Sequence, residues 1–277
     1  MLCVELMGNV LRATALTATL LGACALFPSL GGLSDENDAA QLDVADAAKT
    51  DGPIEGGDAG RWCDSLSPAP MFCDDFDDQG PLTRWTDSFV RAGATIGRDG
   101  TDFQSSPNAL LALSPPANSP SGAYVYLDTA STKSKVHIAY DMRIDARDTS
   151  VGYAEINYVI IAAPIPIDFY MRVFDDPSSI TTMTSEANVD GGVLAHDVPL
   201  AGAPRFDAWT RVTVDIDLAT AHAMTVTIDG QTAGTQSLES NLYAPGPMTV
   251  RVGIGYTGSP TTSDWRIRYD NATIDWQ

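Results

Sequence analysis

Short segments that alternate apolar and polar residues recur from Trp62 to the end of the chain, separated by clusters of Gly, Pro, Asn, Asp and Ser. No stretch past Trp62 shows the apolar period of an amphipathic helix. In a strand, successive side chains point to opposite faces, so alternation buries one face and leaves the other in water. The pattern predicts an all-β fold, a two-sheet antiparallel β-sandwich or a barrel, over residues 61–277.

The predicted strands are bounded by these turn signals. They cover residues 109–113, 123–127, 136–144, 153–161, 167–174, 210–217, 224–228, 249–254 and 265–274. The pair Asp229-Gly230 follows the segment 224–228 and is typical of a two-residue hairpin turn. A hairpin is therefore expected at this point.

The N-terminal 23 residues have the features of an export signal. The apolar run 13–23 is too short to cross a bilayer, and Arg12 precedes it as a positive flank. Residues 21–24, Leu-Gly-Ala-Cys, match the bacterial lipoprotein cleavage box, which predicts cleavage before Cys24 and lipidation of its thiol. The alternatives are an ordinary secretory signal cleaved near Ala25, or a buried cysteine in a core helix. We expect an exported protein, lipid-anchored to the bacterial cell envelope.

Residues 24–60 are predicted to form a flexible acidic linker. They are rich in Asp, Ala and Gly and contain no aromatic residue after Phe27, so they cannot bury enough apolar surface to fold. The whole chain has a formal net charge of -20. Because phosphate binding needs clustered Lys and Arg, this charge argues against nucleic acid as a partner. Membrane contact is expected through the lipid anchor only.

Cys63 and Cys73 are the cysteines that remain for the folded part of an exported chain. Their spacing at the start of the domain predicts a local disulfide, worth about 2–3 kcal/mol. A metal site built on this pair is a weak alternative because no histidine lies near it in the sequence.

Several segments resemble the concanavalin A-like jelly roll, in the right order along the chain. They are 72–77 (FCDDFD) followed by Trp85, 106–110 (SPNAL), 208–215 (AWTRVTVD), 224–230 (MTVTIDG) and 269–274 (YDNATI). The resemblance implies two antiparallel sheets, one of them concave. Members of this group include lectins, laminin G-like domains, glucanases and polysaccharide lyases.

Three predicted strands, 136–144, 153–161 and 167–174, supply the candidate binding residues. If they are neighbours, their apolar sets pack against the second sheet and their polar sets share one face. Carboxylates, amides and guanidinium groups bind sugar hydroxyls, and aromatic rings stack on sugar rings. The alternative is an ordinary solvated sheet face whose charges pair across strands. The predicted carbohydrate-binding residues are His137, Asp141, Arg143, Tyr153, Glu155, Asn157, Asp168, Tyr170 and Arg172.

Catalysis is a possible use of the same face, with Glu155, His137 and Tyr170 as candidate catalytic residues. The glucanases that the chain resembles place catalytic carboxylates on alternate residues of one strand, whereas the segment 155–159 (EINYV) holds one acid only. A second carboxylate would have to come from Asp141 or Asp168 on another strand. A lyase needs a base and a group that neutralises the substrate carboxylate, but the lyase sequence motifs are absent.

The sequence therefore favours a cell-surface lipoprotein with a non-catalytic, lectin-like sandwich whose partner is a polysaccharide or glycan. The first alternative is a glycoside hydrolase or polysaccharide lyase that uses the same face. The second is a structural or protein-binding module of the envelope.

No cofactor is expected apart from a possible structural calcium ion. Calcium takes carboxylate and carbonyl oxygens, and in the related folds it often joins the first strand to the closing one. That resemblance points to Asp75, Asp77 and Asp270 as ligands. The alternative is that these are hydrogen-bonded aspartates at strand ends.

Overall fold

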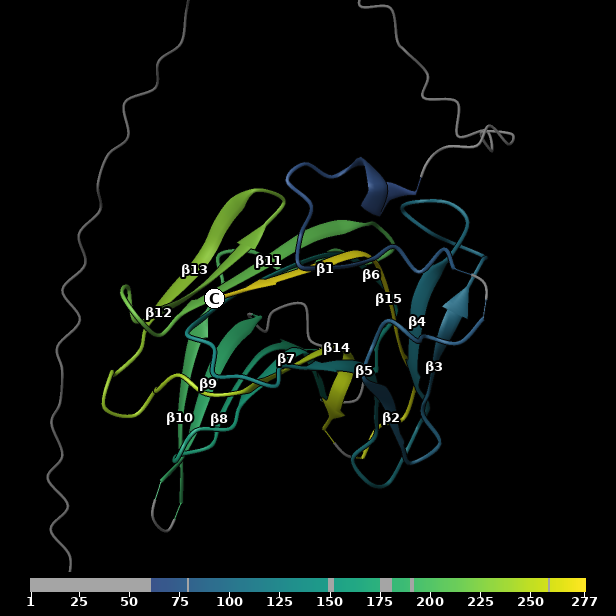
Figure 1. Ribbon diagram of the computed structural model, residues 1–277. Helices are drawn as coiled ribbons and strands as arrows, with labels where there is room; N and C mark the ends of the chain where they lie inside the picture. Colours follow the sequence, from purple (N-terminus) through teal and green to yellow (C-terminus); the bar gives the residue numbers. More distant parts are fainter. Residues whose placement is uncertain (1–60, 79, 149–151, 175–180, 190–191, 259) are drawn as a thin grey trace, which may run out of the picture. The chain divides into compact units, whose positions relative to one another are not determined.

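Two antiparallel sheets packed face to face make up the described part of the chain (Figure 1). The structure, a computed structural model, describes residues 61–277 except 79, 149–151, 175–180, 190–191 and 259, and it does not describe the side chains of residues 157 and 158. The predicted signal peptide and linker (residues 1–60), including Cys24, lie outside the described residues. No helix among the described residues is long and apolar enough to cross a membrane.

Sheet A contains the closing strand of the chain near its middle. Its order is β13 (Gln231–Ser237), β12 (Ala223–Ile228), β11 (Thr210–Asp217), β6 (Lys135–Ala146), β15 (Trp265–Trp276), β4 (Ala109–Ser114) and β3 (Thr95–Asp99). The short strand β1 (Phe72–Asp74) also pairs with β15. The single turn of 3-10 helix η1 (Trp62–Ser65) precedes β1.

Sheet B is the second layer. Its order is β10 (Gly192–Pro199), β9 (Thr182–Val189), β8 (Ile167–Phe174), β7 (Tyr153–Ile161), β14 (Met248–Thr257), β5 (Gly122–Asp128) and β2 (Asp87–Arg91). We call the face of sheet B that is turned away from sheet A the outward face of sheet B, and we name the corresponding face of sheet A in the same way.

The core lies between the sheets and follows the alternation of the strands. In β6 the buried residues include Ile138, Tyr140 and Met142, and in β8 they include Phe169 and Met171. Their neighbours in sequence point to the outward faces because side-chain direction alternates along a strand.

The predicted all-β, two-sheet sandwich is confirmed, and each predicted strand segment falls within an observed strand. The hairpin between β12 and β13 is confirmed as well. Asp229 and Gly230 have φ values of 48° and 77°, which the favoured two-residue hairpin turn requires at both of its central positions.

The prediction that segments 136–144, 153–161 and 167–174 share one face is wrong. Strand β6 lies in sheet A between β11 and β15, whereas β7 and β8 are neighbours in sheet B. The chain changes sheets between β6 and β7, so the polar sides of these strands lie on opposite sides of the sandwich. Alternation specifies the two faces of each strand but not the sheet that the strand joins.

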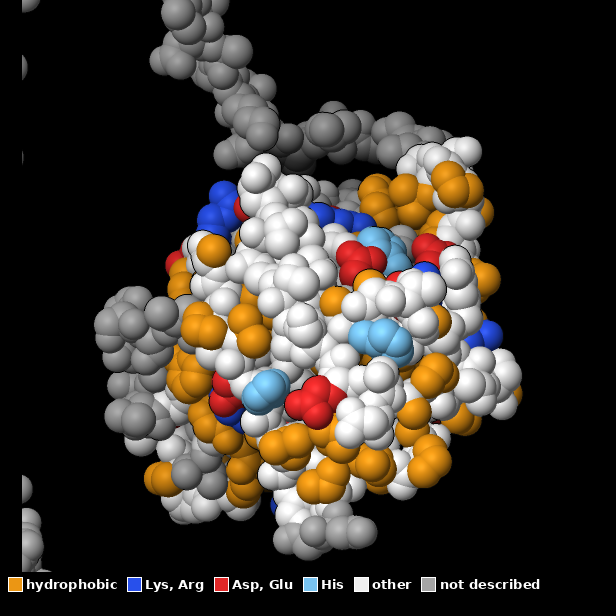
Figure 2. Space-filling view, turned by 90° about the vertical axis from the view of Figure 1, so that its left-hand side faces the viewer, with side chains coloured by type: hydrophobic (Ala, Val, Ile, Leu, Met, Phe, Trp, Pro, Cys, Tyr) orange, Lys and Arg blue, Asp and Glu red, His pale blue; other side chains and the backbone are white. Residues whose placement is uncertain are grey.

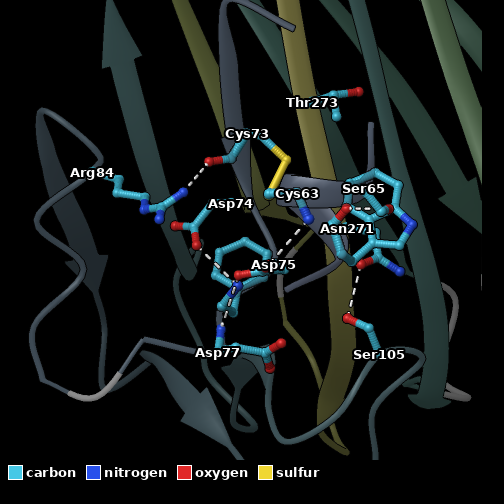
Figure 3. The surroundings of a disulfide bond; sticks show 12 residues. Cys63, Ser65, Cys73, Asp74, Asp75, Asp77, Arg84, Ser105, Asn271 and Thr273 are labelled. Atoms are coloured by element: carbon cyan, nitrogen blue, oxygen red, sulfur yellow. Dashed lines mark hydrogen bonds between the residues drawn. A yellow bond between two sulfur atoms is a disulfide. The ribbon is translucent and has the colours of Figure 1, made fainter. Parts of the chain in front are cut away.

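The predicted disulfide is confirmed between Cys63 and Cys73, whose Cα atoms are 5.9 Å apart (Figure 3). It ties η1 to β1. The Arg84 guanidinium donates to the carbonyl oxygen of Cys73 at 2.7 Å, and the buried Asp74 carboxylate accepts from the Trp85 indole N–H at 2.8 Å. The opening segment is therefore attached to sheet A by covalent and polar contacts together.

Candidate functional site

The outward face of sheet B brings together part of the predicted site. Glu155 on β7 lies directly opposite Arg172 on β8, and Tyr153 lies two residues before Glu155 on the same face. Tyr170 lies two residues before Arg172 and therefore also on this face. On the next strand, β9, the register places Glu186 opposite Asp168, beside Tyr170. Three neighbouring strands thus build one polar cluster.

A chain of hydrogen bonds connects four of these residues, and we call them the β7–β9 network: Glu155, Arg172, Tyr170 and Glu186. Nη2 of Arg172 donates to Oε1 of Glu155 at 3.1 Å and to the Tyr170 hydroxyl oxygen at 2.7 Å. The Tyr170 hydroxyl in turn donates to Oε1 of Glu186. The network fixes the side chains of three strands relative to one another, so the surface that they form is preorganised.

Arg172 is the centre of this network. Its guanidinium lies 4.7 Å from the centroid of the Tyr153 ring and 5.1 Å from that of Tyr170. Its Nη1 also lies 3.8 Å from Oδ1 of Asp197 on the edge strand β10. Stacking and ion pairing together hold a charged group in place that would otherwise move freely.

Glu155 is an acidic group in a nearly buried position, with 8% of the residue exposed. Burial raises the pKa of its carboxyl group to about 7, and the charges of Glu186 and Asp168 add to the rise, against the opposing effect of Arg172. Near neutral pH this carboxyl group therefore exists in both protonation states.

Tyr170 is 1% exposed and its hydroxyl group is bonded within the network. Burial first, and then the hydrogen bond to Glu186, raise its pKa well above the usual value. A base must reach the proton that it removes. The structure therefore makes Tyr170 a positioning residue and not an exposed base.

Aromatic side chains border the network on the side of β14. The ring of Tyr153 stacks with that of Tyr256 on β14, with centroids 6.0 Å apart, and the Phe174 centroid lies 5.9 Å from that of Tyr153. Tyr256 pairs directly with Glu155 across the sheet. Half-buried tyrosine rings beside a carboxylate and a guanidinium group provide the two kinds of contact that a sugar uses.

A hollow of about 420 Å³ lies further along the same face, over β2, β5 and β14. Phe89 on the edge strand β2 stacks on Tyr124, with ring centroids 5.0 Å apart, and the Arg251 guanidinium lies 4.6 Å from the Tyr124 centroid. Asp87 and Asp128 also line it. The hollow thus combines aromatic and charged groups in one place.

The predicted site residues of β6 lie elsewhere, on the outward face of sheet A. Arg143 pairs with Asp102 and Asp145, and Asp141 accepts from the amide of Asn271 at 2.8 Å. These groups belong to charge pairs between β6, β15 and neighbouring loops. They cannot act on a ligand bound to sheet B because the core separates the two faces.

His137, a candidate catalytic residue, is also on sheet A. Its Nδ1 lies 2.7 Å from Oδ1 of Asp215 on β11, and this contact raises its pKa. Figure 2 shows histidine side chains spread over the end of the sandwich near β12, β13, β9 and β10, with acidic side chains beside some of them. They are not gathered at one point.

Asn157 and Asp168 complete the predicted set. The side chain of Asn157 lies outside the described residues. Asp168 lies on the outward face of sheet B, opposite Glu186, and its charge helps to raise the pKa of Glu155.

Sequence reasoning misses Glu186, Asp197, Tyr256, Phe89 and the pair formed by Tyr124 and Arg251. The buried face of strand β9 (TMTSEANV) includes the small residues Ser185 and Ala187 beside Met183, so its apolar signal is weak. The segments 123–127 and 249–254 are predicted as strands. Their aromatic and basic residues are the sequence feature that could have indicated a binding surface there.

Two of the predicted calcium ligands, Asp75 and Asp77, follow β1 (Figure 3), and the third, Asp270, lies on the closing strand β15. The buried Asp270 carboxylate accepts hydrogen bonds from the backbone N–H groups of Gln104, Ser105 and Asn271 at 2.7–2.9 Å, and from the Ser105 hydroxyl. These bonds occupy the acceptor positions that a cation would use. The carboxylate therefore fits a link between the closing strand and the preceding loop better than a calcium ligand.

Asp75 and Asp77 make similar contacts. Asp75 accepts from the backbone N–H groups of Cys63 and Asp77, and Asp77 accepts from that of Asn108 at 3.1 Å. Among the described residues, no group of three or more His, Cys, Asp or Glu side chains is placed to hold a metal ion. Calcium at this point stays a prediction, and we derive no chemistry from it.

Comparison with solved structures identifies the architecture. An endo-β-1,4-glucuronan lyase from the fungus Trichoderma reesei superposes with a TM-score of 0.56 at 15% identity, over 75% of this chain and 96% of that one. A glycoside hydrolase family 16 endo-glucanase from Bacteroides ovatus gives 0.51 at 13% identity, over 74% and 99%. This chain therefore shares the two-sheet jelly-roll fold of these carbohydrate-active proteins.

A cellulose-induced protein shares the same jelly roll, with a TM-score of 0.51 at 13% identity over 73% of this chain and 96% of that one. No protein-family model matches the chain, and no curated protein gives a significant match. At these identities the likeness shows the jelly roll alone, so the residues of this chain must carry any statement about its function.

Proposed function

We propose that this chain is an exported lipoprotein that binds a polysaccharide, without breaking it, on the outward face of sheet B. The observation that carries the proposal is the β7–β9 network with the Tyr153 and Tyr256 rings beside it. Carboxylate and guanidinium groups bind hydroxyl groups in fixed directions, and the rings offer flat apolar area. The names of the structural neighbours, a lyase and a glucanase, agree with a glycan as the ligand.

Binding is favoured over catalysis by the state of the candidate catalytic residues. Glu155 is held by Arg172, Tyr170 is buried, and His137 lies on the opposite side of the sandwich. A substrate on sheet B would therefore meet neither an exposed tyrosine base at position 170 nor this histidine.

The test is a glycan array followed by titration calorimetry on the best ligand. We expect Tyr153→Ala to weaken binding about tenfold, because it removes a stacking surface. Tyr153→Phe, which keeps the ring, should retain most of the affinity. His137→Ala is the matched control on the other sheet and should bind like the wild type. Absence of glycan binding, or equal losses in Tyr153→Ala and His137→Ala, would refute the proposal.

Degradation of the glycan is the second candidate, and one observation favours it. The pKa of Glu155 lies near 7 beside the carboxylates Glu186 and Asp168, as a general acid requires. Release of reducing ends would indicate hydrolysis, and an unsaturated product absorbing in the ultraviolet would indicate elimination. Either activity should disappear in Glu155→Gln. A third candidate, a protein-binding envelope module, would gain support if no glycan bound and an envelope protein co-purified.

The export proposal is tested separately from the ligand. The motif at residues 21–24 supports lipidation of Cys24. Metabolic labelling with a radioactive fatty acid in a bacterial host should mark the wild type and leave Cys24→Ser unlabelled. Labelling of the variant, or a soluble wild type, would contradict the anchor.

A further inference from the structure

We propose that the outward face of sheet B selects an uncharged glycan, and that the chain of sugars must reach from the β7–β9 network to a second anchor point at Phe89. This inference rests on the proposed glycan binding and adds to it the class of glycan and a second contact site. Two independent observations carry it: the position of the hollow at Phe89 and the balance of charges on the face.

The hollow and the network lie in line across the sheet. Phe89 pairs with Tyr124, and Tyr124 pairs with Gly253 of β14. On β14, residue 253 lies between the pairs Arg251–Tyr158 and Ile254–Ile156. The part of β7 opposite Gly253 lies between Ile156 and Val159. The same part of β7 lies opposite Tyr170 of β8. The line from Tyr170 to Phe89 therefore runs nearly perpendicular to the strands.

The two anchor points are too far apart for one sugar. From β7 to β2 there are three steps between strands, to β14, β5 and β2, of about 4.8 Å each, so Tyr153 and Phe89 are at least roughly 14 Å apart. The position of Tyr153 further along β7 than the register of Phe89 adds to this distance. One sugar ring covers only part of this span. A ligand that contacts Tyr153 and Phe89 at once is therefore an extended chain of several units, and a short oligosaccharide contacts one point only.

The second anchor point is preorganised. The Tyr124 residue is 7% exposed, and its ring is held between Phe89 and the Arg251 guanidinium. Phe89 is 42% exposed beside a hollow of about 420 Å³, a size typical of small-molecule sites. Asp87 and Asp128 line the same hollow and can accept hydrogen bonds from hydroxyl groups.

The charges of the face disfavour an acidic glycan. Strand register places more carboxylates than guanidinium groups on it: Asp87, Asp128, Glu155, Asp168, Glu186 and Asp197 against Arg91, Arg172 and Arg251. The chain as a whole is acidic too, with a net charge of -20. A uronate carboxylate brought to this face would meet like charge at short range. Neutral sugars meet hydrogen-bond acceptors instead.

The experiment measures affinity against chain length. Neutral gluco-, xylo- and manno-oligosaccharides from dimer to hexamer are titrated into the protein by calorimetry, with alginate and polyglucuronate as acidic glycans. Wild type, Phe89→Ala and Val90→Ala are compared. Val90 is the matched control because it is the next residue on β2, is 55% exposed, and points to the other face.

We expect affinity to rise with length for a neutral series and to be weak for both acidic polymers. Phe89→Ala should lower affinity about tenfold for the hexamer and leave the dimer unchanged. Val90→Ala should change neither. Neutral binding that is equal in Phe89→Ala and Val90→Ala would overturn the second anchor point while the proposed function stands. Preference for alginate or polyglucuronate would overturn the neutral class. Failure of every glycan to bind would overturn the proposed function itself.

Discussion

Glu155 is an acidic side chain placed where burial opposes its ionisation. An unfolded glutamate loses its proton near its ordinary pKa of 4.5, whereas in the folded protein the pKa of Glu155 is raised to about 7. Between these values the folded state holds more protons than the unfolded state, so stability falls as pH rises. A group that lowers stability at neutral pH is more easily explained by a role in binding than by a role in folding.

Glu155→Gln should therefore stabilise the protein at pH 8 by on the order of 2 kcal/mol and change little at pH 4. The measurement is urea denaturation at both pH values. Glu239→Gln, at an exposed position, controls for the loss of one negative charge. A gain in stability of the same size at pH 4 and pH 8, or a gain shared by the control, would contradict the role of burial.

At the scale of strands, the pairing of β14 with β5 leaves no room for a side chain at Gly253. This residue has a φ of 138°, and a Cβ atom built on it would lie 2.4 Å from the carbonyl oxygen of Ala123. The hydroxyl of the buried Tyr269 donates to the Gly253 carbonyl at 2.8 Å across the core. The position therefore needs glycine for its backbone conformation and for the space around it.

Gly253→Ala should destabilise the protein by at least about 2 kcal/mol, since it adds both strain and overlap. Gly97→Ala on β3 is the matched control because nothing lies within 4 Å of its added Cβ. The measurement is the urea denaturation midpoint of each variant, which should be lower in Gly253→Ala than in Gly97→Ala. Similar midpoints would show that the two strands can separate at Gly253 without cost.

The disulfide belongs to the same scale because it joins η1 to β1. Cys63 and Cys73 are 10 residues apart in sequence, and cross-linking a loop of this size restricts the unfolded chain by about 2–3 kcal/mol. Cys63→Ser with Cys73→Ser should lower the thermal midpoint by several degrees. Reductant should lower the thermal midpoint of the wild type to that of the variant and leave the thermal midpoint of the variant unchanged. A lower midpoint of the variant in reductant would show that the reductant acts other than by breaking this disulfide.

Strands can be predicted where one face is buried and apolar, and two of the missed strands lack such a face. Strand β2 (DSFVR) is exposed along its length and β10 nearly so, hence neither shows a clear alternation. Alternation assigns the faces of β6, β8 and the first half of β7 correctly. A bulge between Ile156 and Val159 shifts the second half of β7, where Val159 and not Ile160 is buried in the core. Alternation also does not give the distribution of the strands between two sheets. Pairing partners depend on contacts between residues far apart in sequence. The part of the candidate site on β7 and β8 can be predicted because each of these strands has a buried apolar face. The part on β9, β10 and β2 cannot be predicted in this way.

At the scale of the whole molecule, the sandwich separates two charged faces by a continuous core. The pairs of Arg143 with Asp102 and Asp145 lie on sheet A, and the contacts of Arg172 with Glu155 and Tyr170 lie on sheet B. No residue is shared between the two groups of contacts. Their energies should therefore be independent.

A double-mutant cycle tests this separation. The stability losses of Arg143→Ala and Arg172→Ala should add to within about 0.5 kcal/mol in the double variant. Glycan affinity should fall in Arg172→Ala and stay unchanged in Arg143→Ala. Larger coupling energy, or weaker binding in Arg143→Ala, would show that the two sheets communicate through the core.

The position of the Cys63–Cys73 bridge has a mechanical consequence. A pull on the chain ahead of Cys63 bypasses the loop between the two cysteines and reaches β1 directly, because a covalent bond does not yield at such loads. The load then falls on the backbone pairing of β1 with β15. A load applied ahead of Cys63 therefore first meets the covalent bridge and the pairing of β1, which belongs to sheet A and not to the sheet that carries the candidate site.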